Sequence, residues 1–396
     1  MTKKNKLFCG QPAGQLRNIL GLVPDTQPID SWFWPAQKIY FHKARIGIRH
    51  ACTLMEIQTG DEVLAPAYYC GSEIDPLIKA GARVTLYRVD RSCRIDIADI
   101  RKRICKKTRV IYLTYFYGFP QDIHALKELC DQYGLYLLED CALSLFSLTE
   151  SRNLGATGDL SVFNLTKVLP VPDGGILIVN NKMLNRAPLE FAAPDKLIIL
   201  RRLLPFLKSN ILRYMSRKKP LQPSYRILYW LLNGKRIREI EKEIQKAGQS
   251  KIRSDMYYDA RKMHARTMSS WTKRMLGAYQ PDKIRKARRE NYTLLACLLR
   301  GLRSVTILFP DLEEGVCPLN LPILVENRDR LHIELYKRGI DAGAYWKGYH
   351  SAFPLHEYPE AQYLKNHVLA LPIHQELDER HVRYIADTLI DVLKGN

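Results

Sequence analysis

Two ionisable side chains that follow buried strands constrain this chain more than any other feature. Residues 135–138 (LYLL) have the uninterrupted apolar character of a strand buried in a parallel sheet, and Asp140 comes shortly after them. Lys167 follows a second short strand over residues 160–165 and precedes a turn rich in proline and glycine. Ligands of an open α/β sheet bind beyond the carboxyl ends of its strands. We therefore expect both side chains to lie where such a fold has its chemistry.

An acid at one strand end and a lysine at the next suit the cofactor pyridoxal 5′-phosphate (PLP). The lysine forms a Schiff base with the cofactor, and the carboxylate keeps the pyridine nitrogen protonated so that the ring accepts electrons. The same residue types also fit a plainer structure, in which the lysine is exposed in a loop and the aspartate caps a helix.

The residues around this pair resemble the DegT/DnrJ/StrS family of PLP-dependent sugar-nucleotide aminotransferases. Family members carry Glu-Asp-small-Ala after a strand, then Gly-Asp, then Phe-Ser with a lysine shortly after, then Gly-Gly before an apolar strand. The matching positions in this chain are Glu139-Asp140-Cys141-Ala142, Gly158-Asp159, Phe163-Asn164, Lys167 and Gly174-Gly175. The resemblance covers about residues 40–185 and 280–396, and it fails between them.

The resemblance implies the α/β fold of type I PLP-dependent transferases. Its large domain has a mostly parallel seven-stranded sheet, and its small C-terminal domain is also α/β. The alternation of strand, helix and strand between residues 109 and 139 independently favours a parallel sheet covered by helices. We expect the large domain in residues 1–250 and the small domain in residues 251–396. A homodimer with active sites at the subunit interface is also implied.

By the resemblance, Lys167 is the catalytic residue and Asp140 contacts the pyridine nitrogen. Asn164 stands where the family has a phosphate-binding serine, and its amide N–H can replace the hydroxyl donor. Tyr69, or its neighbour Tyr68, is the candidate to stack on the cofactor ring. Ordinary packing at the edge of the core fits Tyr69 equally well.

A glycine turn into a helix is expected at Ile46-Gly47-Ile48, where the family has a Ser-Gly-Thr turn. A helix N-terminus presents free N–H groups and a partial positive charge, which suit a phosphate. Both hydroxyls of the family turn are missing here, so we expect the backbone of Gly47 and Ile48, with the charge of Arg49, to bind the cofactor phosphate.

The resemblance implies transfer of an amino group from an amino acid, usually glutamate, to a keto-sugar nucleotide, in the biosynthesis of a polysaccharide or another glycan. Leu143 departs from the family, which has glutamine or histidine there against the cofactor. Such departures leave an alternative open: a catalytically degenerate member with a binding or scaffold role at a membrane surface.

The net charge of +20 is confined to one segment. Residues 195–303 hold 28 Lys/Arg and 8 Asp/Glu, whereas the rest of the chain holds 33 of each sign. Within it, residues 195–246 combine basic residues with apolar residues at helical spacing, which predicts an inserted helical hairpin that Pro205 should kink or split. Residues 196–238 suit a subunit contact or a solvated basic face, or else a helix lying on an anionic membrane. No nucleic-acid partner is expected, because no known binding motif is present.

The nine cysteines are scattered without metal-ligand spacing, so we expect reduced thiols and no metal site. The first residues lack the apolar core of a secretory signal, and no stretch of 18 apolar residues is present. We therefore expect a cytoplasmic protein that reaches a membrane only peripherally, through residues 196–238.

Overall fold

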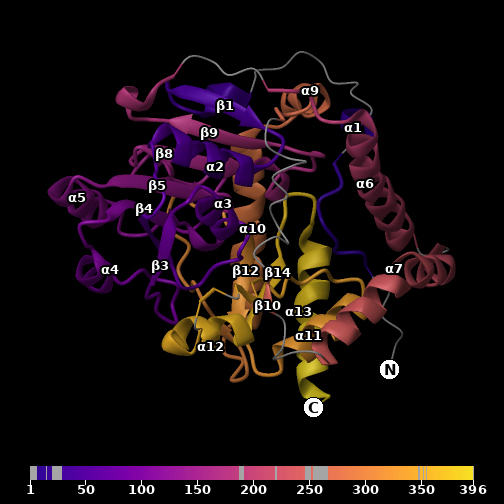
Figure 1. Cartoon of the computed structure of the whole chain (residues 1–396). Helices are drawn as coiled ribbons and strands as arrows, with labels where there is room; N and C mark the ends of the chain where they lie inside the picture. The colour runs from indigo at the N-terminus through magenta and orange to yellow at the C-terminus, as the bar shows by residue number, and fades with distance from the viewer. Residues whose placement is uncertain are drawn as a thin grey trace.

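The computed structural model shows a large sheet with helices packed against it, a smaller sheet, and a pair of long helices at one side (Figure 1). The structure describes residues 7–14, 16–19, 29–186, 191–218, 221–245, 251–252, 266–346, 348–350, 352–353 and 355–395.

Seven strands form the large sheet: β1 (Gln37–Phe41), β2 (Glu62–Pro66), β3 (Arg83–Tyr87), β4 (Thr108–Thr114), β5 (Tyr136–Cys141), β8 (Leu160–Asn164) and β9 (Gly175–Val179). Their order is β1-β9-β8-β5-β4-β2-β3. All neighbours from β3 to β8 are parallel, whereas β9 is antiparallel to both β8 and β1. The prediction of a mostly parallel, seven-stranded sheet is therefore confirmed.

Four helices connect or cover these strands: α2 (Ala44–Leu54), α3 (Ile74–Lys79), α4 (Ile97–Arg103) and α5 (Ile123–Tyr133). Local sequence sets the ends of α5, because the side chain of Asp122 accepts a hydrogen bond from the N–H of Ala125, and Gly134 adopts the left-handed conformation after the last turn. Every residue of β9 is buried, as expected for a strand covered on both faces.

The C-terminal part contains α10 (Pro281–Leu299), β11 (Thr306–Ile307), β12 (Asn320–Leu324), α11 (Arg328–Lys337), α12 (Pro359–His367), β14 (Val368–Pro372) and α13 (Glu379–Lys394). Strand β12 lies between β11 and β14 and is antiparallel to both. This agrees with the small α/β unit that was predicted. The proposed boundary at residue 250 falls beside residues outside the described ranges, so it stays a prediction.

Buried Arg288 on α10 joins this part to the loop after the candidate catalytic lysine. Its guanidinium donates hydrogen bonds to the carbonyl oxygens of Leu319 at 2.9 Å and Val168 at 3.4 Å. Gln375 donates to the same Val168 oxygen at 3.0 Å and accepts from Arg288. The position of the residue that follows Lys167 therefore depends on the C-terminal part.

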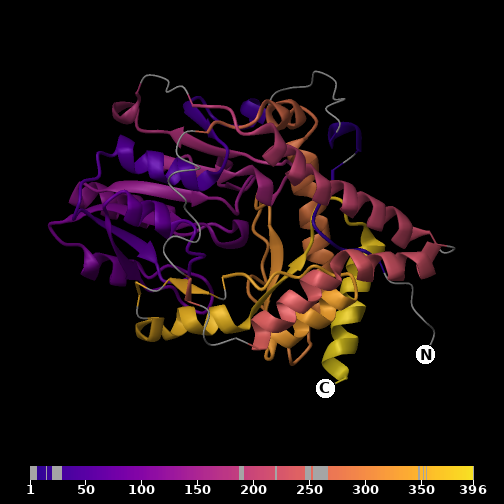
Figure 2. The same cartoon turned by 45° about the vertical axis from the view of Figure 1, so that its right-hand side comes forward.

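The basic segment forms two helices, α6 (Lys196–Arg217) and α7 (Gln222–Gln245), which lie at the edge of the molecule (Figure 2). Helix α7 packs against α11, where Ile237 and Ile240 meet Ile333. Helix α6 runs through Pro205 without ending, so this proline does not split the helix, while the predicted alternative of a kink stays a prediction. Pro205 is exposed, and we attribute the tolerance to water, which can satisfy the carbonyl left unpaired by the missing N–H.

Shorter elements complete the described fold: α1 (Leu16–Ile19), the hairpin β6 (Leu148–Thr149) and β7 (Arg152–Asn153), α9 (Ser270–Leu276), and the pair β10 (Lys251–Ile252) and β13 (Tyr349–His350). No helix in the described ranges is both long and apolar enough to cross a membrane.

Candidate active site

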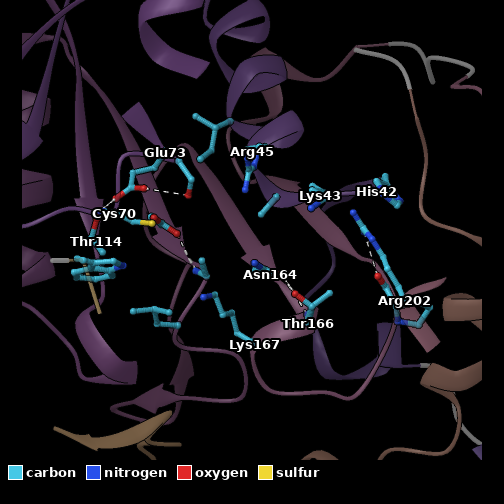
Figure 3. Close-up of a pocket in the computed structure, with 18 residues that line it drawn as sticks. His42, Lys43, Arg45, Cys70, Glu73, Thr114, Asn164, Thr166, Lys167 and Arg202 are labelled. Atoms are coloured by element: carbon cyan, nitrogen blue, oxygen red, sulfur yellow. Dashed lines mark hydrogen bonds between the residues drawn. The ribbon is translucent and has the colours of Figure 1, made fainter. Parts of the chain in front are cut away.

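A cavity of about 390 Å³ lies at the carboxyl ends of three neighbouring parallel strands (Figure 3). Thr114 ends β4, Asp140 is the last residue but one of β5, Asn164 ends β8, and all three line the cavity. Lys167 reaches the same cavity from the short turn that follows β8. The structure thus brings Asp140 and Lys167 together, as the strand pattern predicted, while their chemical roles stay predictions.

Asp140 is a buried carboxyl with two hydrogen-bond donors. Its Oδ2 accepts from the hydroxyl of Tyr112 at 2.8 Å, and its Oδ1 accepts from the N–H of Ala142 at 2.9 Å. Burial raises the pKa of Asp140 to about 7, the charge of Glu73 adds to this, and the hydrogen bonds and Lys167 oppose it. A cationic partner, such as a protonated ring nitrogen, stabilises the charged form of a buried carboxyl whose pKa is raised.

Glu73 is a second buried carboxyl in the cavity, and nothing in the sequence distinguished it from a residue at an ordinary helix start. It accepts a hydrogen bond from the N–H of Cys70 at 2.7 Å, and burial raises its pKa. The buried ammonium of Lys365 on α12 is close enough to oppose that shift, and it donates hydrogen bonds to the carbonyl oxygens of Tyr69 and Trp346. Lys365 therefore links the C-terminal part to the segment of Tyr69 beside the cavity.

Tyr69 is absent from the described residues that line the cavity. Its hydroxyl accepts a hydrogen bond from the N–H of His350 at 3.0 Å, and its ring centroid lies 4.4 Å from the Lys365 ammonium. Trp346 lines the cavity instead, with its ring 4.7 Å from that of Tyr68. Packing at the edge of the core therefore describes the surroundings of Tyr69, and the sequence did not identify Trp346.

The helix expected to follow a glycine turn begins three residues before that glycine. Helix α2 starts at Ala44 with Lys43 in the capping position, and Gly47 lies inside it. A Cβ atom on Gly47 would lie 3.4 Å from the ring of Phe41 and 3.6 Å from Leu177. The predicted turn is wrong, because Gly47 is helical, and a Cβ atom there would make only ordinary van der Waals contacts with the sheet.

This shift changes which groups lie at the helix N-terminus. Lys43, Ala44 and Arg45 line the cavity there, and Ile48 also lines it, one turn into the helix. Arg49 lies elsewhere, and its guanidinium donates to the hydroxyl of Thr53 at 3.2 Å. Gly47, Ile48 and Arg49 stay predictions as cofactor contacts, and of these the structure places Ile48 in the cavity lining.

One end of the cavity is strongly cationic. Lys43 and Arg45 approach it from α2, and Arg202 approaches it from α6 (Figure 3). Burial lowers the pKa of Lys43 to about 8, and the nearby charges of Arg202 and Arg45 lower it further. The sequence did not identify Arg202, because it lies 35 residues beyond Lys167 within a run of other basic residues.

Asp173 organises this end of the cavity without lining it. The carboxylate accepts from the Nδ1 of His42 at 2.9 Å, from the N–H of Ser269 at 2.9 Å and from the hydroxyl of Thr272. Burial alone would raise the pKa of Asp173, but these hydrogen bonds outweigh it and lower the pKa. The sequence signal was only its position before Gly174-Gly175, which did not distinguish it from a turn residue.

The side chains present fit PLP. A carboxyl suits the ring nitrogen, a lysine amine suits the aldehyde carbon, and cations suit the phosphate. Asn164 uses its side-chain oxygen to accept from the N–H of Thr166 at 3.1 Å, which leaves its NH₂ group as the donor for a ligand. The hydroxyl of Thr114 is buried in the cavity wall and lacks a hydrogen-bond partner among the described residues. No cluster of three or more metal-ligating side chains occurs in the described ranges.

A family model confirms what the residues resemble. The model of the DegT/DnrJ/EryC1/StrS aminotransferase family matches residues 44–193 and 279–390. The chain belongs to this family. The match omits residues 194–278, which include α6 and α7.

Curated relatives include a dTDP-4-dehydro-2,3,6-trideoxy-D-glucose 4-aminotransferase of Saccharopolyspora spinosa. It is 24% identical over 387 residues, which cover 93% of this chain and 89% of the relative. A GDP-perosamine synthase of Vibrio cholerae is 28% identical over 142 residues, which cover 35% of this chain and 39% of that relative. The match thus spans about two fifths of the length of the second protein.

Among solved structures, the aminotransferase PseC of Helicobacter pylori, involved in the biosynthesis of pseudoaminic acid, has a TM-score of 0.64 at 14% identity, covering 99% of both chains. DesV of S. venezuelae has a TM-score of 0.64 at 19% identity, covering 92% of this chain and 86% of its own. At these identities the likeness shows the fold. It confirms the predicted type I fold, and the family match bears out the predicted aminotransferase class and PLP cofactor.

We predict that Asp140→Asn stabilises the cofactor-free protein above pH 7 and has little effect near pH 4. The raised pKa means that the folded protein holds a proton that the unfolded chain loses near pH 4, so stability falls as the pH rises towards 7. Asparagine cannot ionise, so this cost of up to about 4 kcal/mol disappears. Urea unfolding of both proteins at several pH values measures the difference.

Glu314→Gln, at an exposed carboxyl, serves as the control for this measurement. The prediction is contradicted if the difference between wild type and Asp140→Asn stays constant from pH 5 to pH 8.

Proposed function

We propose that this protein transfers an amino group from an amino acid to a keto-sugar nucleotide, with PLP as its cofactor. One observation carries the proposal: in a chain of this family, Asp140 and Lys167 line a single cavity at the strand ends. The curated relatives named above act on nucleotide-linked sugars by their names, which supports the substrate class. Their products suggest a place in the biosynthesis of a polysaccharide or another glycan.

The two ionisable residues have separate tasks in this proposal. When bound, the cofactor supplies an electron-accepting ring that makes the carbon beside the amino group acidic. Asp140 keeps the ring nitrogen protonated through its negative charge, which its buried hydrogen bonds hold in place. Lys167 would hold the cofactor through its amine, and its free Nζ would accept and return the proton at the substrate α-carbon.

A catalytically degenerate scaffold is the competing proposal, and specific departures favour it. Leu143 lines the cavity where the family has a polar residue, and Lys43-Ala44-Arg45 at the helix start carry no hydroxyl. Against it, Asp140 and Lys167 are both present in the cavity, and a scaffold has no use for that pair. The two proposals differ in whether Lys167 binds the cofactor.

We predict that PLP gives the wild-type protein a visible absorbance band and that borohydride then fixes the cofactor on Lys167, as read by peptide mass spectrometry. Lys167→Ala should lose the attachment completely. It should also lose amino transfer by at least about 10²–10⁴-fold, because Lys167 is the group proposed to move the proton. Lys182→Ala, at an exposed lysine, is the matched control and should behave as wild type.

Two results would count against the enzyme. A wild-type protein that forms no band with added PLP favours the scaffold, and attachment or transfer that survives in Lys167→Ala shows that another residue does the chemistry.

We also propose that the protein is a homodimer, because the resemblance implies active sites shared between two subunits. We predict that light scattering on the eluting peak gives twice the mass of the chain at micromolar concentration. A monomer under these conditions would contradict a shared site.

The outer face of the α6–α7 hairpin supports a second proposal, a peripheral membrane contact. Of the 13 large hydrophobic side chains that are exposed in the described part of the chain, ten lie on these two helices. They are Leu197, Ile198, Leu200, Leu204, Ile211, Tyr214, Ile227, Trp230, Leu231 and Leu232. The inner face is already packed, since Leu212 and Tyr229 form a buried cluster with Phe8. The exposed face is therefore not needed to hold the hairpin on the protein.

Charge favours an anionic membrane as the partner of this face. Residues 196–238 contain 12 Lys/Arg and no Asp/Glu. Each basic residue near an anionic lipid surface contributes about 1 kcal/mol to the free energy of membrane binding. Exposed apolar side chains strengthen this binding by inserting between the lipids. Two copies of the same face would bring like charges together, which disfavours self-association there. We propose that the hairpin docks on the cytoplasmic face of a membrane where glycans are assembled.

We predict co-sedimentation with vesicles that contain phosphatidylglycerol, and none with neutral phosphatidylcholine vesicles. Trp230→Ser combined with Leu231→Ser should reduce binding at least about tenfold, because it removes two large exposed side chains. Binding should also be lost at about 0.5 M salt, where the screening length is a few ångströms.

Met183→Ser removes a still more exposed apolar side chain outside the hairpin and should bind as wild type. The membrane proposal fails if the protein ignores anionic vesicles at low salt, or if the hairpin variant and the control bind alike.

A further inference from the structure

Arg202 belongs to the basic hairpin, yet it lies in the wall of the active-site cavity. Helix α6 turns Ile199 and Leu203 inward, both of which are buried, and Arg202 lies on the same side. Its neighbour Arg201 is exposed. Helical periodicity therefore divides the basic residues of α6 between an inner group and an outer group.

The guanidinium of Arg202 is held at the loop that follows Lys167. One of its amino groups donates to the carbonyl oxygen of Pro172 at 3.2 Å. This contact uses one of the five donors of the guanidinium, which is a planar fork suited to phosphate oxygens. Pro172 also lines the cavity, so the contact directs the arginine to the cavity wall.

Lys43 and Arg45 bring two more cations to the same end. Burial lowers the pKa of Lys43 to about 8, with Arg202 and Arg45 as further causes, so the three side chains are close enough to repel one another. The buried carboxylate of Asp173 lies near them, but it accepts hydrogen bonds from His42 and Ser269. A bound anion at this end would relieve the repulsion.

The backbone at the start of α2 adds positive potential at the same end of the cavity. The N-terminus of α2, an 11-residue helix, lies at Lys43 and Ala44, and both of these residues line the cavity. The first N–H groups of a helix have no partner within it and attract negative charge. Side chains from two distant segments and one helix end thus converge on one end of the cavity.

We propose that Arg202, with Lys43 and Arg45, forms a phosphate-binding site that the inserted hairpin completes within the same chain. The ligand is the 5′-phosphate of the cofactor or the diphosphate of a nucleotide-linked sugar, since both are phosphate groups that belong in this cavity. The inference rests on the function proposed above. It goes further because residues 194–278 lie outside the family match, so the family assigns no role to Arg202.

Paired titrations of PLP and of pyridoxal, which lacks the phosphate, test the first ligand. If Arg202 binds the cofactor phosphate, Arg202→Ala weakens PLP binding about tenfold or more and leaves pyridoxal binding unchanged. Arg202→Lys keeps the charge and should recover part of the affinity. Arg201→Ala removes the adjacent exposed arginine and should bind both compounds as wild type.

Titration of the PLP-loaded protein with GDP and dTDP tests the second ligand. If Arg202 binds the substrate diphosphate, Arg202→Ala weakens nucleotide binding about tenfold while PLP binding stays unchanged. Urea unfolding shows whether the variant keeps the wild-type stability.

The proposal is overturned if Arg202→Ala, folded as wild type, changes neither the ratio of PLP to pyridoxal affinity nor nucleotide binding. It is also overturned if Arg201→Ala has the same effect. These results are separate from the failure of the proposed function, which would show as the absence of a Lys167-dependent band with either PLP or pyridoxal in the wild-type protein.

Discussion

The buried carboxylate of Asp173 is the interaction on which the geometry of the site depends. An ionised carboxylate away from water is costly unless it is fully hydrogen-bonded, and its donors come from His42, Ser269 and Thr272. Asp173 and its donors lie on three segments: the loop after Lys167 holds Asp173, the approach to α2 holds His42, and the start of α9 holds Ser269 and Thr272. Satisfying one charge therefore fixes the helix N-terminus and the lysine loop relative to each other.

The glycine pair after Asp173 allows the same segments to touch. A Cβ atom on Gly175 would lie 2.4 Å from the backbone nitrogen of Ala44, so β9 can begin against the helix start only without a side chain. Gly174 donates its N–H to the carbonyl oxygen of His42 at 3.1 Å and has a φ of +134°, which favours glycine. Backbone contact at these two glycines thus brings the start of β9 against the start of α2.

The hairpin gives one inserted segment two chemically different faces. Its inner face packs on Phe8 and on α11, and it carries Arg202 into the cavity wall. Its outer face combines exposed apolar side chains with basic residues that have no acidic neighbour in residues 196–238. A change in this segment could therefore affect both ligand affinity and the location of the protein, and the experiments on Arg202 and on Trp230 separate the two.

The sequence by itself determined the features that depend on near neighbours: the buried strands, the caps of α5, and the placement of Asp140 and Lys167 at strand ends. Parallel strands bring their carboxyl ends together, so those two residues could be predicted to meet. It misplaced the start of α2, because a glycine that packs on Phe41 looks in sequence like a glycine that turns. Only the tertiary structure decided that Arg202 joins Lys43. Periodicity tells which residues share a helix face, but which face turns inward depends on what packs against it from elsewhere in the chain.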